Sequence, residues 1–215
     1  SVNLSDKVGL KGLHINSFSN LDSLAKEKIA SIAKVNTDSF IALNTVFCSN
    51  GFHLKVEKNT ALQTPIHIIY VSSAESEAIV NSRNLIELEE NAQAIIIERQ
   101  VVIGKGKIFT NFLSEKFVAQ NAKLDSYLLQ NEGLLGYSVN TNQVQIESNS
   151  VYHNTTVTLN GAVVRNNHHV VLSGKNSEAN LNGLFSSKGT QLIDNHTLMD
   201  HQVPNCESNE LYKGI

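Results

Sequence analysis

The end of the sequence, DNHTLMDHQVPNCESNELYKGI, concentrates side chains that bind metals or move protons. Asp194, His196, Asp200, His201 and Cys206 supply the carboxylate, imidazole and thiolate groups that bind zinc or iron. Their spacing matches no closed metal motif, because the segment has one thiol and neither a CxxC nor an HExxH pattern. If the segment is a strand, alternation puts His201 on the opposite face from Asp194, His196 and Asp200. Cys206, His201, His196 and Asp200 are therefore only weak metal candidates.

Structural roles are the more common explanation for the same residues. An isolated cysteine such as Cys206 is most often a small buried hydrophobe beside a turn. Histidines in a strand, such as His196 and His201, most often face solvent or form a hydrogen bond. No phosphate loop or GxSxG elbow is present, and the sequence indicates no catalytic residue. The glutamates between positions 87 and 98 are interpreted as a solvated strand face.

The elements that position these residues begin with a helical segment over residues 1–50. In LDSLAKEKIASIAK, residues 21–34, apolar side chains recur at helical spacing, and Asn20 or Asp22 can cap the helix. A shorter helix is predicted over residues 37–47, with Phe40, Leu43 and Phe47 on one face. From residue 51 onward the apolar period becomes twofold, which predicts many short strands over residues 51–215.

A weak internal repeat accompanies these strands. Measured on Ala92, Ala122, Ser150 and Ala179, segments that open with a polar pair and a small residue recur at intervals of 30, 28 and 29 residues. A near-constant period of this size favours stacked coils, so an all-β solenoid is preferred over a β-sandwich with irregular loops. The abundant asparagines fit this interpretation, because stacked amides can hydrogen-bond from coil to coil.

Composition excludes several classes of partner. The chain has 215 residues, 17 Lys and Arg against 20 Asp and Glu, and no long basic run, so we expect no nucleic-acid or membrane partner. No apolar stretch reaches the roughly 18 residues that span a bilayer, and the sequence shows no signal peptide. These features predict a cytoplasmic protein whose two cysteines are thiols.

Several segments together resemble the SufB/SufD core family of iron–sulfur cluster assembly proteins, the SufD branch more than the SufB branch. They are DSFIALNTVFCSNGFHLKVEKN at 38–59, PIHIIYV at 65–71 and residues 163–215, which hold RN, LNGLF, DNHT, HxxxxCxS and YKG. The resemblance implies a right-handed parallel β-helix with a short N-terminal helical segment. It also implies a scaffold that pairs with SufB and docks the ATPase SufC, and not an enzyme.

The resemblance further implies that the chain is a fragment. In the family, more coils, a late segment with a cysteine and a histidine, and a C-terminal helical region that binds SufC follow this point. Residues 51–215 would then be an incomplete β-helix core, with the end of the sequence as one of its interior coils. No cofactor is expected in the isolated chain, although iron or an iron–sulfur cluster could bind transiently in the complex.

An unpaired terminal coil must be capped, so a homodimer through the β-helix is also expected. Two alternative functions stay open at this stage. One is a β-helix enzyme acting on carbohydrate, which the low aromatic content of 6% and the absence of Trp disfavour. The other is a small metal-binding module built on the terminal cluster.

Overall fold

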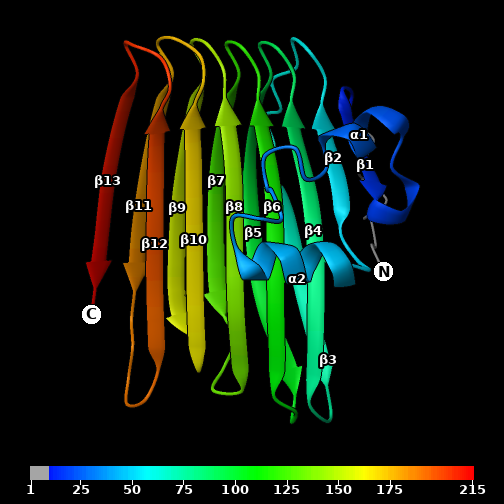
Figure 1. Cartoon of the computed structure of the whole chain (residues 1–215), viewed down its shortest axis with the longest axis vertical. Helices are drawn as coiled ribbons and strands as arrows, with labels where there is room; N and C mark the ends of the chain where they lie inside the picture. The colour runs from blue at the N-terminus through cyan, green and yellow to red at the C-terminus, as the bar shows by residue number, and fades with distance from the viewer. Residues whose placement is uncertain (1–9) are drawn as a thin grey trace.

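The computed structural model describes residues 10–215, which wind into a parallel β-solenoid preceded by a short helical segment (Figure 1). Two sheets face each other across its bore. Sheet A contains β1 (Leu13–Ser17), β2 (Phe52–Val56), β4 (Ala78–Leu88), β6 (Ile108–Val118), β8 (Gly136–Ile146), β10 (Val163–Leu172) and β12 (Leu192–His201). Sheet B contains β3 (Ile66–Ala74), β5 (Gln93–Gly104), β7 (Lys123–Asn131), β9 (Val151–Asn160), β11 (Glu178–Phe185) and β13 (Glu207–Gly214).

From β2 onward, successive strands alternate between the two sheets, so each coil places one strand in each of them. From β2 onward, neighbouring strands within a sheet pair in parallel. At the N-terminal end, β1 pairs antiparallel with β2. The predicted parallel β-helix with a short N-terminal helical segment is confirmed.

A ladder of asparagines forms one corner of the solenoid. Five of them adopt a left-handed backbone with φ between 57° and 61°, a conformation that asparagine tolerates better than other side chains: Asn59, Asn91, Asn121, Asn149 and Asn176. From Asn91 onward, each side-chain amide donates a hydrogen bond to the preceding asparagine, with lengths of 2.7, 3.0, 3.1 and 3.2 Å. The predicted coil-to-coil stacking of amides therefore exists at this corner.

The small residue that follows each asparagine marks the true repeat. Strand register stacks Ala92, Ala122 and Ser150, as the sequence period predicts. The next member is Ser177 and not Ala179, because Glu178 pairs with Val151. The prediction was wrong by two residues here, since the interval between corner asparagines shortens from 30 to 28 to 27 residues along the chain.

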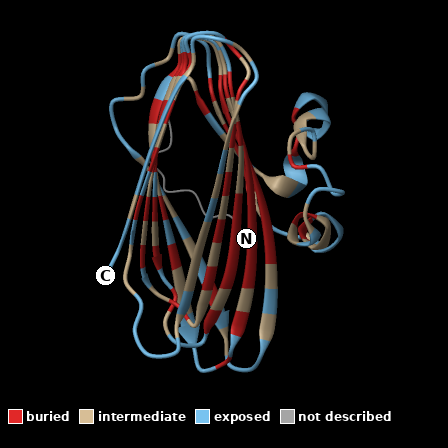
Figure 2. Ribbon diagram, turned by 60° about the vertical axis from the view of Figure 1, so that its left-hand side comes forward, coloured by how far each residue is buried: buried red, intermediate tan, exposed pale blue. Residues whose placement is uncertain are grey.

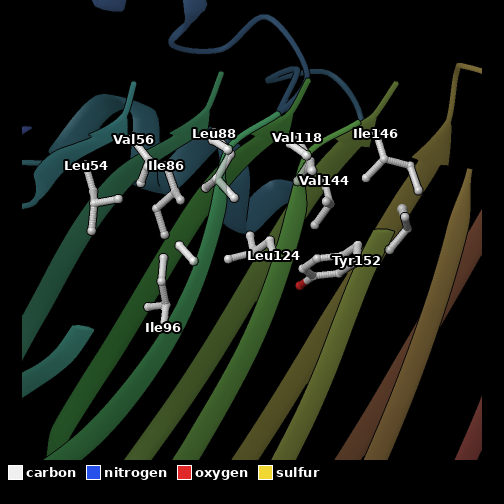
Figure 3. Close-up of a cluster of buried hydrophobic side chains, with 14 of the residues drawn as sticks. Leu54, Val56, Ile86, Leu88, Ile96, Val118, Leu124, Val144, Ile146 and Tyr152 are labelled. Atoms are coloured by element: carbon white, nitrogen blue, oxygen red, sulfur yellow. The ribbon is translucent and has the colours of Figure 1, made fainter. Parts of the chain in front are cut away.

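Aliphatic side chains fill the half of the bore next to this corner. In sheet A, the inward residues Leu54, Ile86 and Leu88 are buried, and Ile96 and Leu124 meet them from sheet B (Figure 3). Because strands pair on both sides in the middle of the stack, inward side chains form continuous rows that exclude water. This core is the main apolar contribution to the fold.

The N-terminal segment lies against the outer face of sheet A and contains η1 (Phe18–Asn20), α1 (Ser23–Lys28) and α2 (Ser39–Phe47) (Figures 1 and 2). Asp22 caps α1 by accepting a hydrogen bond from the Ala25 amide at 2.8 Å, as predicted. No helix of residues 10–215 has the length and apolar character to cross a bilayer.

Two predictions about these helices were wrong. The helix predicted over residues 21–34 ends at Lys28, because the Glu115 carboxylate on β6 binds the amides of Ala30, Ile32 and Ala33. This tertiary contact replaces the hydrogen bonds that would continue the helix.

In α2 the buried side chains are Ile41 and Asn44, whereas Phe47 is 61% exposed. The apolar face predicted from Phe40, Leu43 and Phe47 is therefore not the face that packs. Polar groups on sheet A determine the contact, since Asn44 reaches two backbone carbonyls of the sheet.

Candidate functional site

The predicted metal candidates lie in the last coil, on β12 and the corner before β13. His201 pairs with Leu172, whose side chain is buried in the bore. His201 therefore points toward the bore, and strand alternation points His196 and Asp200 outward. The predicted separation of these residues onto two faces is confirmed.

These candidates also have separate neighbours. Three of them form local contacts: Asp194 with Arg165, His201 with Ser208 at 2.9 Å, and Asp200 with Gln202 at 2.9 Å. Within residues 10–215, no three His, Cys, Asp or Glu side chains lie close enough together to hold a metal ion. The fold thus distributes the terminal cluster over different faces instead of assembling it.

Cys206 occupies the small-residue position of the corner. It follows Asn205, which has φ of 64°, and it stacks on Ser177 in the coil before. Ser177 Oγ lies 3.3 Å from Cys206 Sγ, and the thiol donates to the Gly174 carbonyl at 3.3 Å. This environment is that of a half-buried packing residue beside a turn.

Two motifs that carry the family resemblance meet across sheet B. Gly183 of LNGLF lies opposite Tyr212 of LYKG in the register of β11 and β13. A Cβ atom on Gly183 would approach the Tyr212 ring to 2.1 Å. Glycine is required here because the tyrosine ring lies directly over the backbone.

The half of the bore away from the asparagine corner is polar. Side-chain amides cross it from coil to coil: Gln100 donates to Asn140 at 2.6 Å, Gln130 to Asn166 at 3.0 Å, and Asn166 to Asn195 at 2.9 Å. All except Asn195 are buried. Because these amides are uncharged and hydrogen-bonded, they fix the register of the coils without the large cost of burying charge.

One ion pair lies inside the bore as well. Lys116 Nζ is 3.0 Å from Glu98, and the Tyr70 hydroxyl donates to Glu98 at 2.7 Å. Burial alone would lower the pKa of Lys116, but the Glu98 carboxylate, assisted by Tyr152, raises that pKa above its ordinary value. Burial, with Glu98 nearby, also raises the pKa of Tyr70 well above its usual range. The lysine therefore stays charged and the tyrosine stays neutral at physiological pH.

A buried histidine completes the polar half. His168 Nε2 lies 3.0 Å from the Tyr152 hydroxyl. Burial and the Lys116 ammonium lower the pKa of His168 to about 3, so its imidazole is neutral. As expected for adjacent strand residues, His168 faces the bore and His169 faces outward.

Sequence reasoning missed this interior, because Glu98 was assigned to a solvated face. Glu98 is 5% exposed in the bore, and Glu87, from the same set of glutamates, is 7% exposed on the outer face of sheet A. The missed signal was a polar residue at the inward position of successive coils, as in Gln100 and Gln130, which are 30 residues apart.

The outer face of sheet A carries a second set of buried charges. Arg83 on β4 and Glu115 on β6 form an ion pair at 2.7 Å with side chains that are 1% and 0% exposed. Arg83 also donates to Thr45 Oγ1 on α2 at 2.7 Å. Since Glu115 additionally binds three amides of the segment between α1 and α2, this pair attaches the N-terminal segment to the solenoid.

A neighbouring contact reinforces the attachment near α1. Glu87 on β4 accepts from His53 at 2.8 Å and also contacts Lys28 at the end of α1. Burial would raise the pKa of Glu87, but these two partners hold it below its ordinary value. The carboxylate is therefore charged when the segment is docked.

The last coil leaves two strand edges without partners among the described residues. β12 ends the order of sheet A and β13 ends the order of sheet B. Core residues are also less covered there, since Met199, Cys206 and Tyr212 are only partly buried. Parallel edges with unpaired amides and carbonyls are sites where further strands can add.

Two family models match successive parts of the chain. Residues 70–215 match the SufBD core domain of the SUF system for iron–sulfur cluster assembly, and residues 1–68 match the SufBD protein N-terminal region. The first match covers most of the solenoid, and the second covers β1, the helices and β2.

Individual relatives are more distant. The chain is 25% identical to the iron–sulfur cluster assembly protein SufD of Escherichia coli over 84% of its own length and 44% of the relative. It is 25% identical to a SufBD family protein of Synechocystis over 93% of its length and 47% of the relative. A Mycobacterium tuberculosis SufBD family protein is 28% identical over 74% of the chain and 39% of the relative. The chain thus spans less than half the length of these relatives.

Proposed function

The chain belongs to the SufBD family of iron–sulfur cluster assembly proteins, and we propose that it is part of a non-catalytic scaffold subunit of the SUF complex. In this proposal the whole protein pairs with SufB and docks the ATPase SufC. The main support is the match of residues 70–215 to the SufBD core domain.

SufB pairing, self-association through the β-helix and SufC docking in the full-length protein are all parts of the proposal. Pairing between strand edges of two β-helices would need backbone hydrogen bonds alone and no catalytic group.

Iron or a cluster is treated as transient cargo of the complex. Cys206, His201, His196 and Asp200 stay weak metal candidates, since the fold separates them. Metal analysis after anaerobic purification tests this part, and a stoichiometric metal in the isolated chain would contradict it. The cytoplasmic location likewise stays a prediction from the sequence.

The function is tested by size-exclusion chromatography with light scattering. This chain and a form extended through the family's C-terminal region are each mixed with SufB and SufC. We expect only the extended form to enter a complex that contains SufC. If neither form binds either partner, the family assignment explains the fold but the scaffold function is wrong.

Self-association has its own measurement. Light scattering of this chain alone at micromolar concentration is expected to give the mass of a dimer. A monomeric mass would contradict pairing through the terminal coil and leave the SufB and SufC parts of the proposal standing.

A further inference from the structure

The outer face of sheet B carries an arginine surrounded by apolar side chains. Strand register places nine outward residues in a three-by-three array on β3, β5 and β7. We call this array the Arg99 block; its rows are His67, Ile97 and Tyr127, then Ile69, Arg99 and Leu129, then Val71, Val101 and Asn131.

Arg99 has an aliphatic neighbour on each of its four sides. Ile69 and Leu129 lie opposite it on the adjacent strands, and Ile97 and Val101 precede and follow it on its own face of β5. The Arg99 side chain is exposed, and the block contains no carboxylate. Within residues 10–215, the ion pairs and side-chain hydrogen bonds do not include Arg99.

The block is part of a larger apolar surface. Ile69, Val71 and Tyr127 are 54%, 59% and 44% exposed. The row that contains Arg99 continues on later strands through Val157 and Leu184, of which the second is 39% exposed. Exposed apolar surfaces of several hundred Å² generally mark interaction sites. In Figure 2 the helices lie against sheet A, and no helix of the described residues covers sheet B.

The charge of Arg99 specifies the chemistry of what covers this surface. A partner that removes water from the four aliphatic side chains around Arg99 also removes water from its guanidinium. That desolvation is costly unless a carboxylate pairs with the guanidinium. Arginine is among the residues enriched at the centres of protein interfaces, where bidentate pairing with a carboxylate gives both energy and orientation. The partner surface is therefore apolar with an acidic side chain inside it.

The dimensions of the surface fit a helix. Three rows at two-residue spacing span about 13 Å, close to the roughly 10–12 Å diameter of a helix. From β3 to β11 the strands extend about 19 Å, the length of a helix of about 13 residues. On the opposite sheet, α2 already lies across strands in this manner (Figure 1). The backbone groups of these strands already pair with the neighbouring strands of sheet B. A partner can therefore contact this face through side chains but cannot add a strand to it.

We propose that the outer face of sheet B docks an amphipathic helix of a partner protein, with a carboxylate in its apolar stripe that pairs with Arg99. The inference rests on the proposed function, because the helix is expected within the assembled complex. An arginine that merely shields apolar surface from water would have no such fixed partner.

Carbodiimide coupling tests the pairing, because it joins a lysine amine to a contacting carboxylate but leaves arginine unreacted. Arg99→Lys is introduced into the chain extended through the C-terminal region, which is then mixed with SufB and SufC. Mass spectrometry should find one new cross-link that is absent with Arg99. Its acidic residue should lie in a helix of the partner, with apolar residues three and four positions away.

The outcomes are separable. If the parent chain forms no complex, the proposed function fails and this inference falls with it. If the complex forms but Arg99→Lys gives no new cross-link, or links two copies of this chain, only the docking proposal is overturned. Asn209→Lys, at the far end of the same face, is the matched control and should not link to that helix.

A charge reversal sharpens the assignment. Arg99→Glu should weaken binding to the partner at least tenfold, because two carboxylates would then face each other. Replacing the cross-linked acidic residue of the partner with arginine should restore the affinity to within about threefold of the parent pair. A failure of this rescue would overturn the pairing even if a cross-link forms.

Discussion

The two outer faces of the solenoid contrast in what they carry and in what covers them. Sheet A carries the buried pair Arg83 and Glu115 and is covered by the chain's own N-terminal segment. Sheet B carries Arg99 among aliphatic side chains and has no covering helix among the described residues. The charged face is thus the covered one, because its polar groups find hydrogen-bond partners in the N-terminal segment, whereas the more apolar face is exposed.

The strongest test of this contrast removes the charged anchor of the covered face. Glu115→Ala leaves the Arg83 guanidinium buried without its carboxylate and frees the amides of Ala30, Ile32 and Ala33. We expect the free energy of unfolding to fall by about 3–5 kcal/mol. Hydrogen exchange should rise in the segment from α1 to α2, and urea unfolding should give the energy. Unchanged exchange in that segment would contradict an anchoring role for Glu115.

Glu132 is a buried carboxylate that, unlike Glu115, has no cationic partner among the described residues. Glu132, in the turn between β7 and β8, is 2% exposed, and its Oε1 has no hydrogen-bond partner among the described residues. Burial raises the pKa of Glu132 to about 7 from an ordinary value of 4.5. The folded state then binds the proton more tightly than the unfolded state, so stability falls as pH rises from 4.5 to 7 and stays lower above that.

Glu132→Gln should remove this dependence. Relative to the parent, the variant should gain about 3 kcal/mol of stability between pH 4.5 and pH 8. Urea unfolding at both pH values measures the gain. If the variant instead loses stability relative to the parent as the pH rises from 4.5 to 8, the pKa of Glu132 is not raised in the folded state.

A smaller effect is expected for the amide that joins α2 to sheet A. Asn44 donates to the Ser82 carbonyl at 3.0 Å and to the Asn111 carbonyl at 2.8 Å, and it is fully buried. Asn44→Ala should cost about 1–3 kcal/mol, because buried carbonyls lose their donors. Val46→Ala, on the exposed side of the same helix, should change the unfolding free energy by less than about 0.5 kcal/mol. Equal effects of the two variants would mean that the helix is not held by this contact.

The smallest effect is expected on the uncovered face. Ile69→Ser should alter the stability of the isolated chain by less than about 0.5 kcal/mol, because its side chain is 54% exposed. The same change should weaken binding to the proposed helix by about tenfold. A loss of several kcal/mol in the isolated chain would show that this face already packs within the protein.

The sequence contains enough information to predict the solenoid, but not to predict which residue of each coil stacks on which residue of the next. Twofold alternation and the interval between Ala92, Ala122 and Ser150 predicted stacked strands, because the coils repeat at nearly constant length. The predicted stacking was wrong at Ser177, because the coil is shorter there and a count of residues does not reveal the shortening. Only the strand register identifies the stacked position.

Tertiary contacts explain the other failures. The helix predicted over residues 21–34 is interrupted because Glu115, more than 80 residues away, takes its amide donors. The alternation of the terminal cluster was predictable, since it depends on one strand only. The Arg99 block was not, because its members come from three strands and become neighbours only through register.

Hydroxyl-radical footprinting of the extended chain, alone and in complex with SufB and SufC, tests the contrast between the two faces most directly. Labelling should fall at Ile69, Tyr127 and Leu184 on sheet B when the complex forms. It should stay unchanged at Leu24 and Val46, which are 69% and 73% exposed on the outer side of the helices. Protection of the helices with sheet B still fully labelled would contradict the account.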